Sequence, residues 1–325
     1  GNIDLSVGSV VCFVGAVGGK MMVTNEMNPY LSIIVMLLVG LLIGAWQGFW
    51  IAYVRIPPFI VTLAGMLVFR GLSNVVLEGM TLAPMPDNFL ALFNNYIPDF
   101  FGMEGFNMTC FLVGVVVCVL YVFMVLKGRA SRAKKGYRVE PFGGVLIKMI
   151  VICAAVLAFM FRLAQYKGIP NSLVWIVLVI AVYTYIASKT TVGRYFYAVG
   201  GNEKATKLSG INTNRVYFLA YLNMGFLAAV AGMVTTARLN SANPTAGTNF
   251  EMDAIGACFI GGASAYGGTG TVPGVIIGAL LMGVLNLGMS IMGVDQNMQK
   301  VVKGLVLLAA VIFDVVSKRK SFIVK

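Results

Sequence analysis

The chain has 325 residues, of which 59% are hydrophobic and only 11% are charged, and its mean hydropathy is +0.88. A soluble domain carries about a quarter charged residues, so the composition excludes a soluble enzyme and predicts an all-α protein that crosses a membrane many times. The formal net charge is +12, but the basic residues flank apolar stretches, where membrane orientation explains them without a nucleic-acid partner. The chain has no histidine and its cysteines lack paired spacing, so we expect no metal site and no catalytic residue.

Apolar stretches of roughly 17 to 25 residues are long enough to cross a bilayer core of about 30 Å. A shorter apolar stretch at 254–266 runs into the glycine-rich sequence GGTGTVPG, which predicts a short, tilted or broken span. With it, we expect about ten membrane segments in a single domain over residues 1–325. The long stretches are 5–23, 30–54, 58–77, 108–126, 145–163, 171–188, 216–237, 272–292 and 298–316.

The charges between the spans predict the orientation of the chain. Residues 127–148 form an expected basic loop, and the segment 193–215 and the C-terminal tail are basic as well. Basic loops stay in the cytoplasm, so these three regions, including the C-terminus, are predicted to be cytoplasmic. The loop at 78–107 has acidic residues and no Lys or Arg, which places it outside. The charges that carry this argument are Lys127, Arg129, Arg132, Lys134, Lys135, Arg138 and Lys148 on one side, and Glu78, Asp87, Asp99 and Glu104 on the other.

Glycines recur every four residues at Gly40, Gly44 and Gly48. Small residues at this spacing let helix backbones approach closely within a membrane. The pattern favours packing between helices of one chain, and a subunit interface is the alternative.

The polar segment 193–215 reads GRYFYAVGGNEKATKLSGINTNR and lies between two apolar stretches. We expect a short amphipathic helix at 198–208, with Gly200, Gly201 and Gly210 as turn or cap residues. A cytoplasmic surface helix between two spans is a suitable contact for a partner protein.

A second polar run follows the stretch at 216–237. Sugars and other polar solutes are bound by amides and hydroxyls, so this run is a candidate lining for an outer vestibule. An ordinary polar turn around Pro244 is an equally good interpretation, and Asp253 nearby is a candidate ion site or a helix N-terminal charge. The candidate residues are Asn240, Asn243, Thr245, Thr248, Asn249 and Asp253.

Nucleotide-binding motifs do not account for the chain. GGTGTVPG contains a G-x-G, but it lacks the preceding strand and the following acidic residue of a dinucleotide site. The sequence contains no G-x-x-x-x-G-K-[ST] motif, so the chain carries no phosphate-binding loop of its own.

Four segments, in order along the chain, carry a family resemblance: NIDLSVGS, GRYFYAVGGNEKATKLSGIN, ARLNSANPTAGTNFEMDAIGACFIGGAS and GGTGTVPGVIIGAL. Together they resemble the bacterial ABC importer permeases for monosaccharides, namely the ribose, galactose and xylose permeases. EKATKLSGI is similar to the E-A-A-x-x-x-G-I loop of ABC importer permeases, with Lys204 in place of the first Ala. The long basic loop is most similar to that of the multiple-sugar and xylose permeases.

This resemblance implies a type II ABC importer fold and ATP-driven sugar uptake across the bacterial inner membrane. A separate ATPase would contact the segment from Gly200 to Ile211. A sugar-binding protein would dock outside, and a second permease chain would complete the pathway through the lipid bilayer. In the family, IDLSVG follows two earlier helices, so the resemblance also predicts that N-terminal helices are missing here. The implied ATPase-coupling residues are Gly200, Gly201, Asn202, Glu203, Ala205, Gly210 and Ile211.

An ion-coupled secondary transporter or a passive channel for small polar solutes is the rival hypothesis. Such proteins place acidic residues or histidine deep in the membrane, whereas the predicted spans contain few acids. Dependence of uptake on a partner ATPase distinguishes the two.

Overall fold

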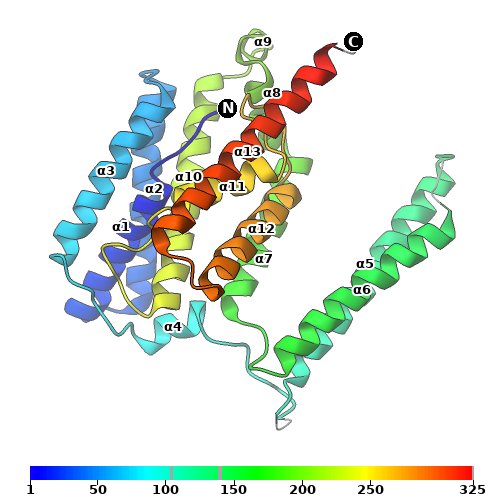
Figure 1. The fold of residues 1–325 in the computed structure, drawn as a ribbon, viewed down its shortest axis with the longest axis horizontal. Coiled ribbons are helices and arrows are strands. Elements are labelled where there is room, and N and C mark those ends of the chain that lie inside the picture. Colours follow the sequence, from blue (N-terminus) through cyan, green and yellow to red (C-terminus); the bar gives the residue numbers. More distant parts are fainter. Residues whose placement is uncertain (103–104, 138–140, 324–325) are drawn as a thin grey trace. The chain divides into compact units, whose positions relative to one another are not determined.

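The computed structural model describes residues 1–102, 105–137 and 141–323, with side chains through Val316. Over these residues the regular structure is helical, with two isolated β-bridges, Leu82 to Ala242 and Tyr96 to Pro170. Figure 1 shows the helices in chain order. They are α1 Val7–Gly19, the π-helical turn Lys20–Thr24, α2 Pro29–Ala52, α3 Pro58–Leu77, α4 Asp87–Phe93, α5 Met108–Lys134, α6 Phe142–Ala164, α7 Asn171–Lys189, α8 Thr191–Gly201, α9 Glu203–Leu208, α10 Thr213–Leu239, α11 Phe250–Ile260, α12 Val272–Ile291 and α13 Gln296–Ile323.

Eight helical segments in the described part of the chain are long and apolar enough to cross a membrane. They are α1 with its π-helical turn, α2, α3, α5, α6, α7, α10 and α12. The predicted short segment at 254–266 consists of α11, an 11-residue helix, followed by an irregular glycine-rich connection. A helix of this length rises only about 16 Å, so the segment is short and broken as expected, and its crossing of the membrane stays a prediction. The long helix α13 takes the place of the last predicted span.

The chain packs as two compact units, and the single permease domain over residues 1–325 stays a prediction. One unit comprises Gly1–Phe93 and Val177–Lys325, and the other comprises Asn94–Ile176. In the second unit α5 and α6 pack against each other around the buried side chains of Cys110, Ala164 and Ile169. This hairpin therefore has an apolar core of its own, which is the physical reason for the division.

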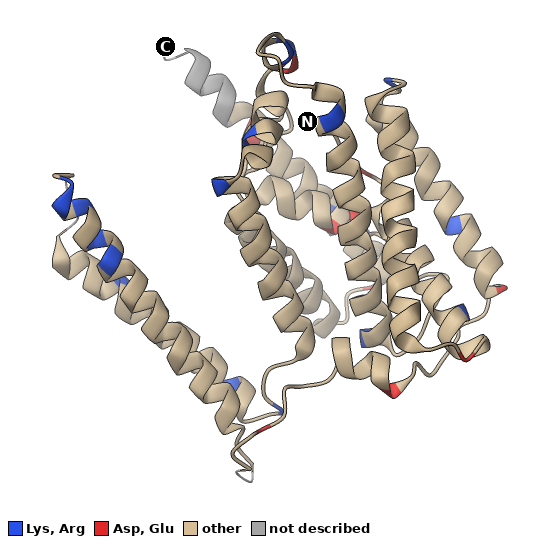
Figure 2. Ribbon diagram, turned by 180° about the vertical axis from the view of Figure 1, so that it is seen from behind, with Lys and Arg blue, Asp and Glu red and all other residues tan. Residues whose placement is uncertain are grey.

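The predicted basic loop at 127–148 is wrong in its extent. Helix α5 continues to Lys134 and α6 begins at Phe142, because the basic stretch is rich in the good helix formers Ala, Lys and Arg, and α5 runs through Gly128. Gly136 adopts a positive φ of 75° after the end of α5, a conformation that favours glycine. Figure 2 shows basic residues, in blue, gathered at one end of this helical hairpin. Arg138 of the predicted loop and Glu104 of the predicted outer loop lie outside the described residues, as does Lys325 of the tail.

The glycines of α2 face α10. A Cβ added to Gly40 would lie 2.5 Å from the Cβ of Ala229, and a Cβ added to Gly44 would lie 2.5 Å from the carbonyl oxygen of Tyr221. Both distances are shorter than any ordinary contact, so only glycine permits this approach. The interpretation of these glycines as packing positions within the chain is confirmed.

Candidate functional site

The two predicted functional segments lie at opposite ends of α10. Helices α8 and α9 precede α10, and the polar loop at 240–249 follows it. Because α10 has 27 residues and an α-helix rises 1.5 Å per residue, the two segments are about 40 Å apart along it. This separation exceeds the bilayer core, so the segments can face opposite sides of a membrane.

The segment predicted as one helix at 198–208 is two helices that meet at Asn202. The backbone of Asn202 is extended, with φ −159° and ψ 99°, and its side-chain oxygen accepts a hydrogen bond of 2.9 Å from the backbone N–H of Ala205. Asn202 is therefore the N-cap of α9. The single-helix prediction is wrong because the capping preference of Asn outweighs continuation of the helix.

Helix α9 ends at Leu208, is followed by Gly210 and presents an exposed surface. Gly210 has a positive φ of 83°, and the backbone N–H of Ile211 reaches back to the carbonyl of Thr206. Leu208 has 89% of its surface exposed, and Ala205 is also exposed. The sequence motif did not single out Leu208, although a leucine at the tip of a polar segment could have indicated it.

Glu203 connects the start of α9 to two other parts of the same unit. One of its carboxylate oxygens accepts a 2.7 Å bond from Nη1 of Arg55, which lies between α2 and α3, and a 3.2 Å bond from Thr213. The other oxygen accepts a 3.1 Å bond from the hydroxyl of Tyr217. The Arg55 guanidinium also lies over the Tyr217 ring, 5.5 Å from its centroid, and donates to Asn214.

These contacts determine the charge state of Glu203. Burial by itself raises the pKa of Glu203, but the hydrogen bonds from Arg55 and Tyr217 and the positive charge of Arg55 together outweigh it. The net result is a pKa below the ordinary value for glutamate. Glu203 is therefore a carboxylate at neutral pH and holds α9 against the Arg55 connection and the first turns of α10.

The polar loop at 240–249 is fixed mainly through its backbone. Nη1 of Arg70, in α3, donates to the carbonyl of Pro244 at 3.1 Å and to the carbonyl of Ala246 at 2.7 Å. The thiol of Cys12, in α1, also donates to Pro244 at 3.3 Å. The side-chain oxygen of Asn240 accepts a 2.9 Å bond from the backbone N–H of Met85. Sequence reasoning missed Arg70, because it lies far along the chain in an apolar stretch.

The remaining candidate residues of the loop mostly bond to one another. Asn243 accepts bonds of 2.8 Å from both the backbone N–H and the hydroxyl of Thr245. The hydroxyl of Thr248 donates to the carbonyl of Thr245 at 2.6 Å. Asn249 adopts a positive φ of 67° before α11. Thr245 and Thr248 are exposed, as is Asn240, so the hydroxyls of the two threonines are accessible candidate groups.

Asp253 belongs to a different environment. Nζ of Lys303, in α13, lies 3.0 Å from each of its two carboxylate oxygens, and Nδ2 of Asn286, in α12, donates to it at 3.1 Å. Lys303 and Asp253 have side chains only 16% and 24% exposed. The structure thus separates Asp253 from the polar loop and assigns it to the packing of α11 with α12 and α13.

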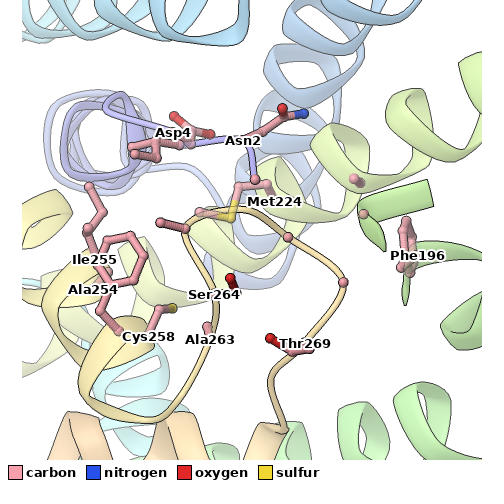
Figure 3. A pocket seen from close by; sticks show the side chains of 18 of the residues that line it. Asn2, Asp4, Phe196, Met224, Ala254, Ile255, Cys258, Ala263, Ser264 and Thr269 are labelled. Atoms are coloured by element: carbon pink, nitrogen blue, oxygen red, sulfur yellow. The ribbon is translucent and has the colours of Figure 1, made fainter. Parts of the chain in front are cut away.

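A cavity of about 450 Å³ lies between the chain's first residues, α8, α10, α11 and the glycine-rich connection after α11. Figure 3 shows Asp4, Phe196, Met224, Cys258, Ser264 and Thr269 around it. The lining is mainly apolar, with a few polar groups among them. Its wall includes Gly200 of the predicted coupling segment.

Eight candidate membrane spans in the described part of the chain, with a capped surface helix before α10, define a polytopic membrane protein. The chain belongs to the family described as branched-chain amino acid transport system / permease component, whose sequence profile matches residues 1–311.

Individual similar proteins are permeases as well. The chain is 38% identical over 320 residues to the xylose transport system permease protein XylH of Escherichia coli (strain K12). The alignment covers 98% of this chain and 79% of that protein. It is 36% identical over 322 residues to XylH of Haemophilus influenzae, in an alignment that covers 98% of this chain and 83% of that protein. It is 35% identical over 314 residues to the ribose import permease protein RbsC of Escherichia coli (strain K12), in an alignment that covers 96% of this chain and 77% of that protein. No solved structure matches the chain. The resemblance to monosaccharide ABC permeases is confirmed.

Proposed function

We propose that this chain is the membrane-spanning subunit of an ATP-driven importer that carries a monosaccharide into a bacterial cell. The proposal is supported by relatives named for xylose and ribose transport, each of which aligns with nearly the whole chain. Xylose and ribose are therefore the first substrates to test. ATP would be bound by a separate subunit, and this chain would supply the pathway.

The Glu203 network is the observation that carries the coupling proposal. Helix α9 offers an exposed face with Ala205 and Leu208 to a partner ATPase. The carboxylate of Glu203 ties the base of this helix to Arg55 and to Thr213 and Tyr217 of α10. A displacement of α9 by the ATPase would therefore move α10 and the connection between α2 and α3.

The other partners follow from the position of the two polar segments. A sugar-binding protein would dock at the end of α10 opposite α9, where Thr245 and Thr248 expose hydroxyls. In this arrangement α9 and the C-terminus face the cytoplasm, and a second copy of the chain completes the pathway. Selectivity for one sugar would lie largely in the binding protein.

The test is uptake of radiolabelled D-xylose and D-ribose into proteoliposomes that contain the chain, its cognate ATPase and its sugar-binding protein. Wild-type uptake is expected to require ATP and the ATPase. Leu208→Asp is expected to weaken ATPase binding and uptake, because it places a charge in the proposed contact. Tyr137→Asp, on the exposed connection after α5, is the control. Equal losses in the two variants would argue against α9 as the contact.

One observation favours an ion-coupled transporter. Asp253 and Lys303 form a largely buried ion pair, and ionisable groups within membrane segments often mark ion pathways. In this structure the charges of Asp253 and Lys303 compensate each other, so the pair can also serve only to hold α11 against α13. Uptake that proceeds without the ATPase and follows an imposed ion gradient would replace the proposed function with this one.

A further inference from the structure

The end of α8 touches the glycine-rich connection between α11 and α12, backbone to backbone. A Cβ added to Gly200 would lie 2.6 Å from the backbone nitrogen of Gly268. A Cβ added to Gly268 would lie 2.7 Å from the Cα of Gly201. Because the opposing atoms belong to the backbone, neither side can give way by rotating a side chain, and this approach requires glycine.

The connection has a defined shape at this contact. Gly267 and Gly268 have positive φ angles of 85° and 73°, and the backbone N–H of Ser264 donates to the carbonyl of Thr269 at 3.2 Å, which closes a loop. The hydroxyl of Tyr197, in α8, donates to the carbonyl of Gly270 at 2.8 Å. Helix α8 therefore holds the loop by a close contact and by a hydrogen bond one turn away.

The same loop forms one wall of the cavity. Ser264, Gly268 and Thr269 line it from the loop, and Phe196 and Gly200 line it from α8. Figure 3 shows the loop passing beside Ser264 and Thr269, with Phe196 on α8. A shift of α8 against the loop would change the walls of the cavity directly.

The loop cannot move independently of the helices that flank it. A Cβ added to Gly261, at the end of α11, would lie 2.5 Å from the carbonyl oxygen of Gly274 in α12. Close contact at this point makes α11 and α12 a tightly packed pair, so a force on the loop between them acts on both. Cys258 of α11 lines the cavity and can report such a change.

We propose that Gly200 is a positioning residue through which movement of the coupling segment reaches the cavity, by way of the Gly267–Gly270 loop. The inference rests on the proposed function and adds a second route to it. The Glu203 network acts on α10, whereas Gly200 acts on α11 and α12. Both routes start in the segment that is proposed to contact the ATPase.

The experiment compares Gly200→Ala with Gly128→Ala in the complete importer. Gly128 lies in helix α5, outside the proposed coupling segment, and a Cβ there meets nothing within 4 Å. Both variants therefore add one methyl group to a helical glycine, and only Gly200→Ala disturbs the loop contact. Sugar transported per ATP hydrolysed is expected to fall about fivefold or more in Gly200→Ala, a loss in the usual range of coupling energies. It is expected to stay at the wild-type value in Gly128→Ala.

A second readout separates coupling from simple damage. The rate at which a small maleimide modifies Cys258, followed by peptide mass spectrometry, is measured with and without ATP and vanadate. Wild type and Gly128→Ala are expected to show a nucleotide-dependent rate, and Gly200→Ala is expected to lose that dependence. Loss of structure alone would raise the rate in both nucleotide states.

A gentler variant keeps the inference testable if Gly200→Ala does not assemble. Tyr197→Phe removes only the hydrogen bond to Gly270, and Tyr195→Phe on the same helix is its control. A lower transport-to-ATP ratio in Tyr197→Phe alone supports the inference. The inference is overturned if Gly200→Ala, or Tyr197→Phe, behaves like its control in an importer whose wild type transports sugar. Wild-type uptake that does not need the ATPase overturns the proposed function instead.

Discussion

The two polar segments at the ends of α10 are held in place in different ways. In the α8–α9 segment a single side chain, Glu203, accepts hydrogen bonds from Arg55, Thr213 and Tyr217. In the loop at 240–249 it is the backbone carbonyls of Pro244 and Ala246 that are held by Arg70. The first arrangement suits a part that transmits movement, since its link is partly exposed and carries charge. The second suits a fixed rim.

Arg70→Ala is expected to have the largest effect on stability. It leaves two loop carbonyls without their charged donor, and each such hydrogen bond contributes about 1.5–3 kcal/mol. The measurement is the thermal unfolding temperature of the purified protein in detergent. Arg70→Lys retains a positive donor and should recover part of the loss. An unchanged unfolding temperature in Arg70→Ala would contradict the view that this arginine fixes the loop.

Asn243→Ala is expected to cost less. It removes the side-chain oxygen that accepts from the N–H and the hydroxyl of Thr245, and a neutral hydrogen bond is worth about 0.5–1.5 kcal/mol. Asn243→Asp keeps that oxygen and should unfold near the wild-type temperature. If Asn243→Asp instead lowers sugar uptake while stability is unchanged, the amide faces the transported solute and the loop lines a vestibule.

These two segments also show what the sequence can predict. The motif EKATKLSGI located the surface helix, and the glycine at 210 marked its end, because caps and turns depend on neighbouring residues. The same local rules could have predicted Asn202 as the N-cap of α9, but the helix expected at 198–208 includes Asn202 in its interior. Local signals therefore identify the segment well and its internal break less well.

The residues that hold the two segments could not be predicted from the sequence. Arg55 lies 148 positions before Glu203 and Arg70 lies 174 positions before Pro244, so both contacts depend on how α2, α3 and α10 pack. The extent of α5 was missed for a different reason. Positive charge was interpreted as a loop, although a helix end also accommodates basic residues such as Arg132 and Lys134 in its last turn.

The coupling between Arg55 and Glu203 is expected to be a small effect on stability. Their side chains are 43% and 34% exposed, and exposed ion pairs contribute about 0.2–1 kcal/mol. A double-mutant cycle with Arg55→Ala and Glu203→Ala, read from unfolding in detergent, measures it. Sugar uptake should fall in both single variants by more than their stability loss explains. A coupling energy of zero together with normal uptake would remove Glu203 from the proposed mechanism.

The smallest expected effect is the pH dependence of this link. The pKa of Glu203 is lower in the folded protein than its ordinary value of 4.5, so the folded state favours the carboxylate. The stabilisation is fully present above about pH 4.5 and is lost as the pH falls through the lower folded pKa. The difference in unfolding free energy between wild type and Glu203→Gln should therefore be constant from pH 7 to pH 5 and shrink below that. A difference that instead grows as the pH falls from 7 to 5 would mean that burial dominates and raises the folded pKa, so that Arg55 does not hold the carboxylate.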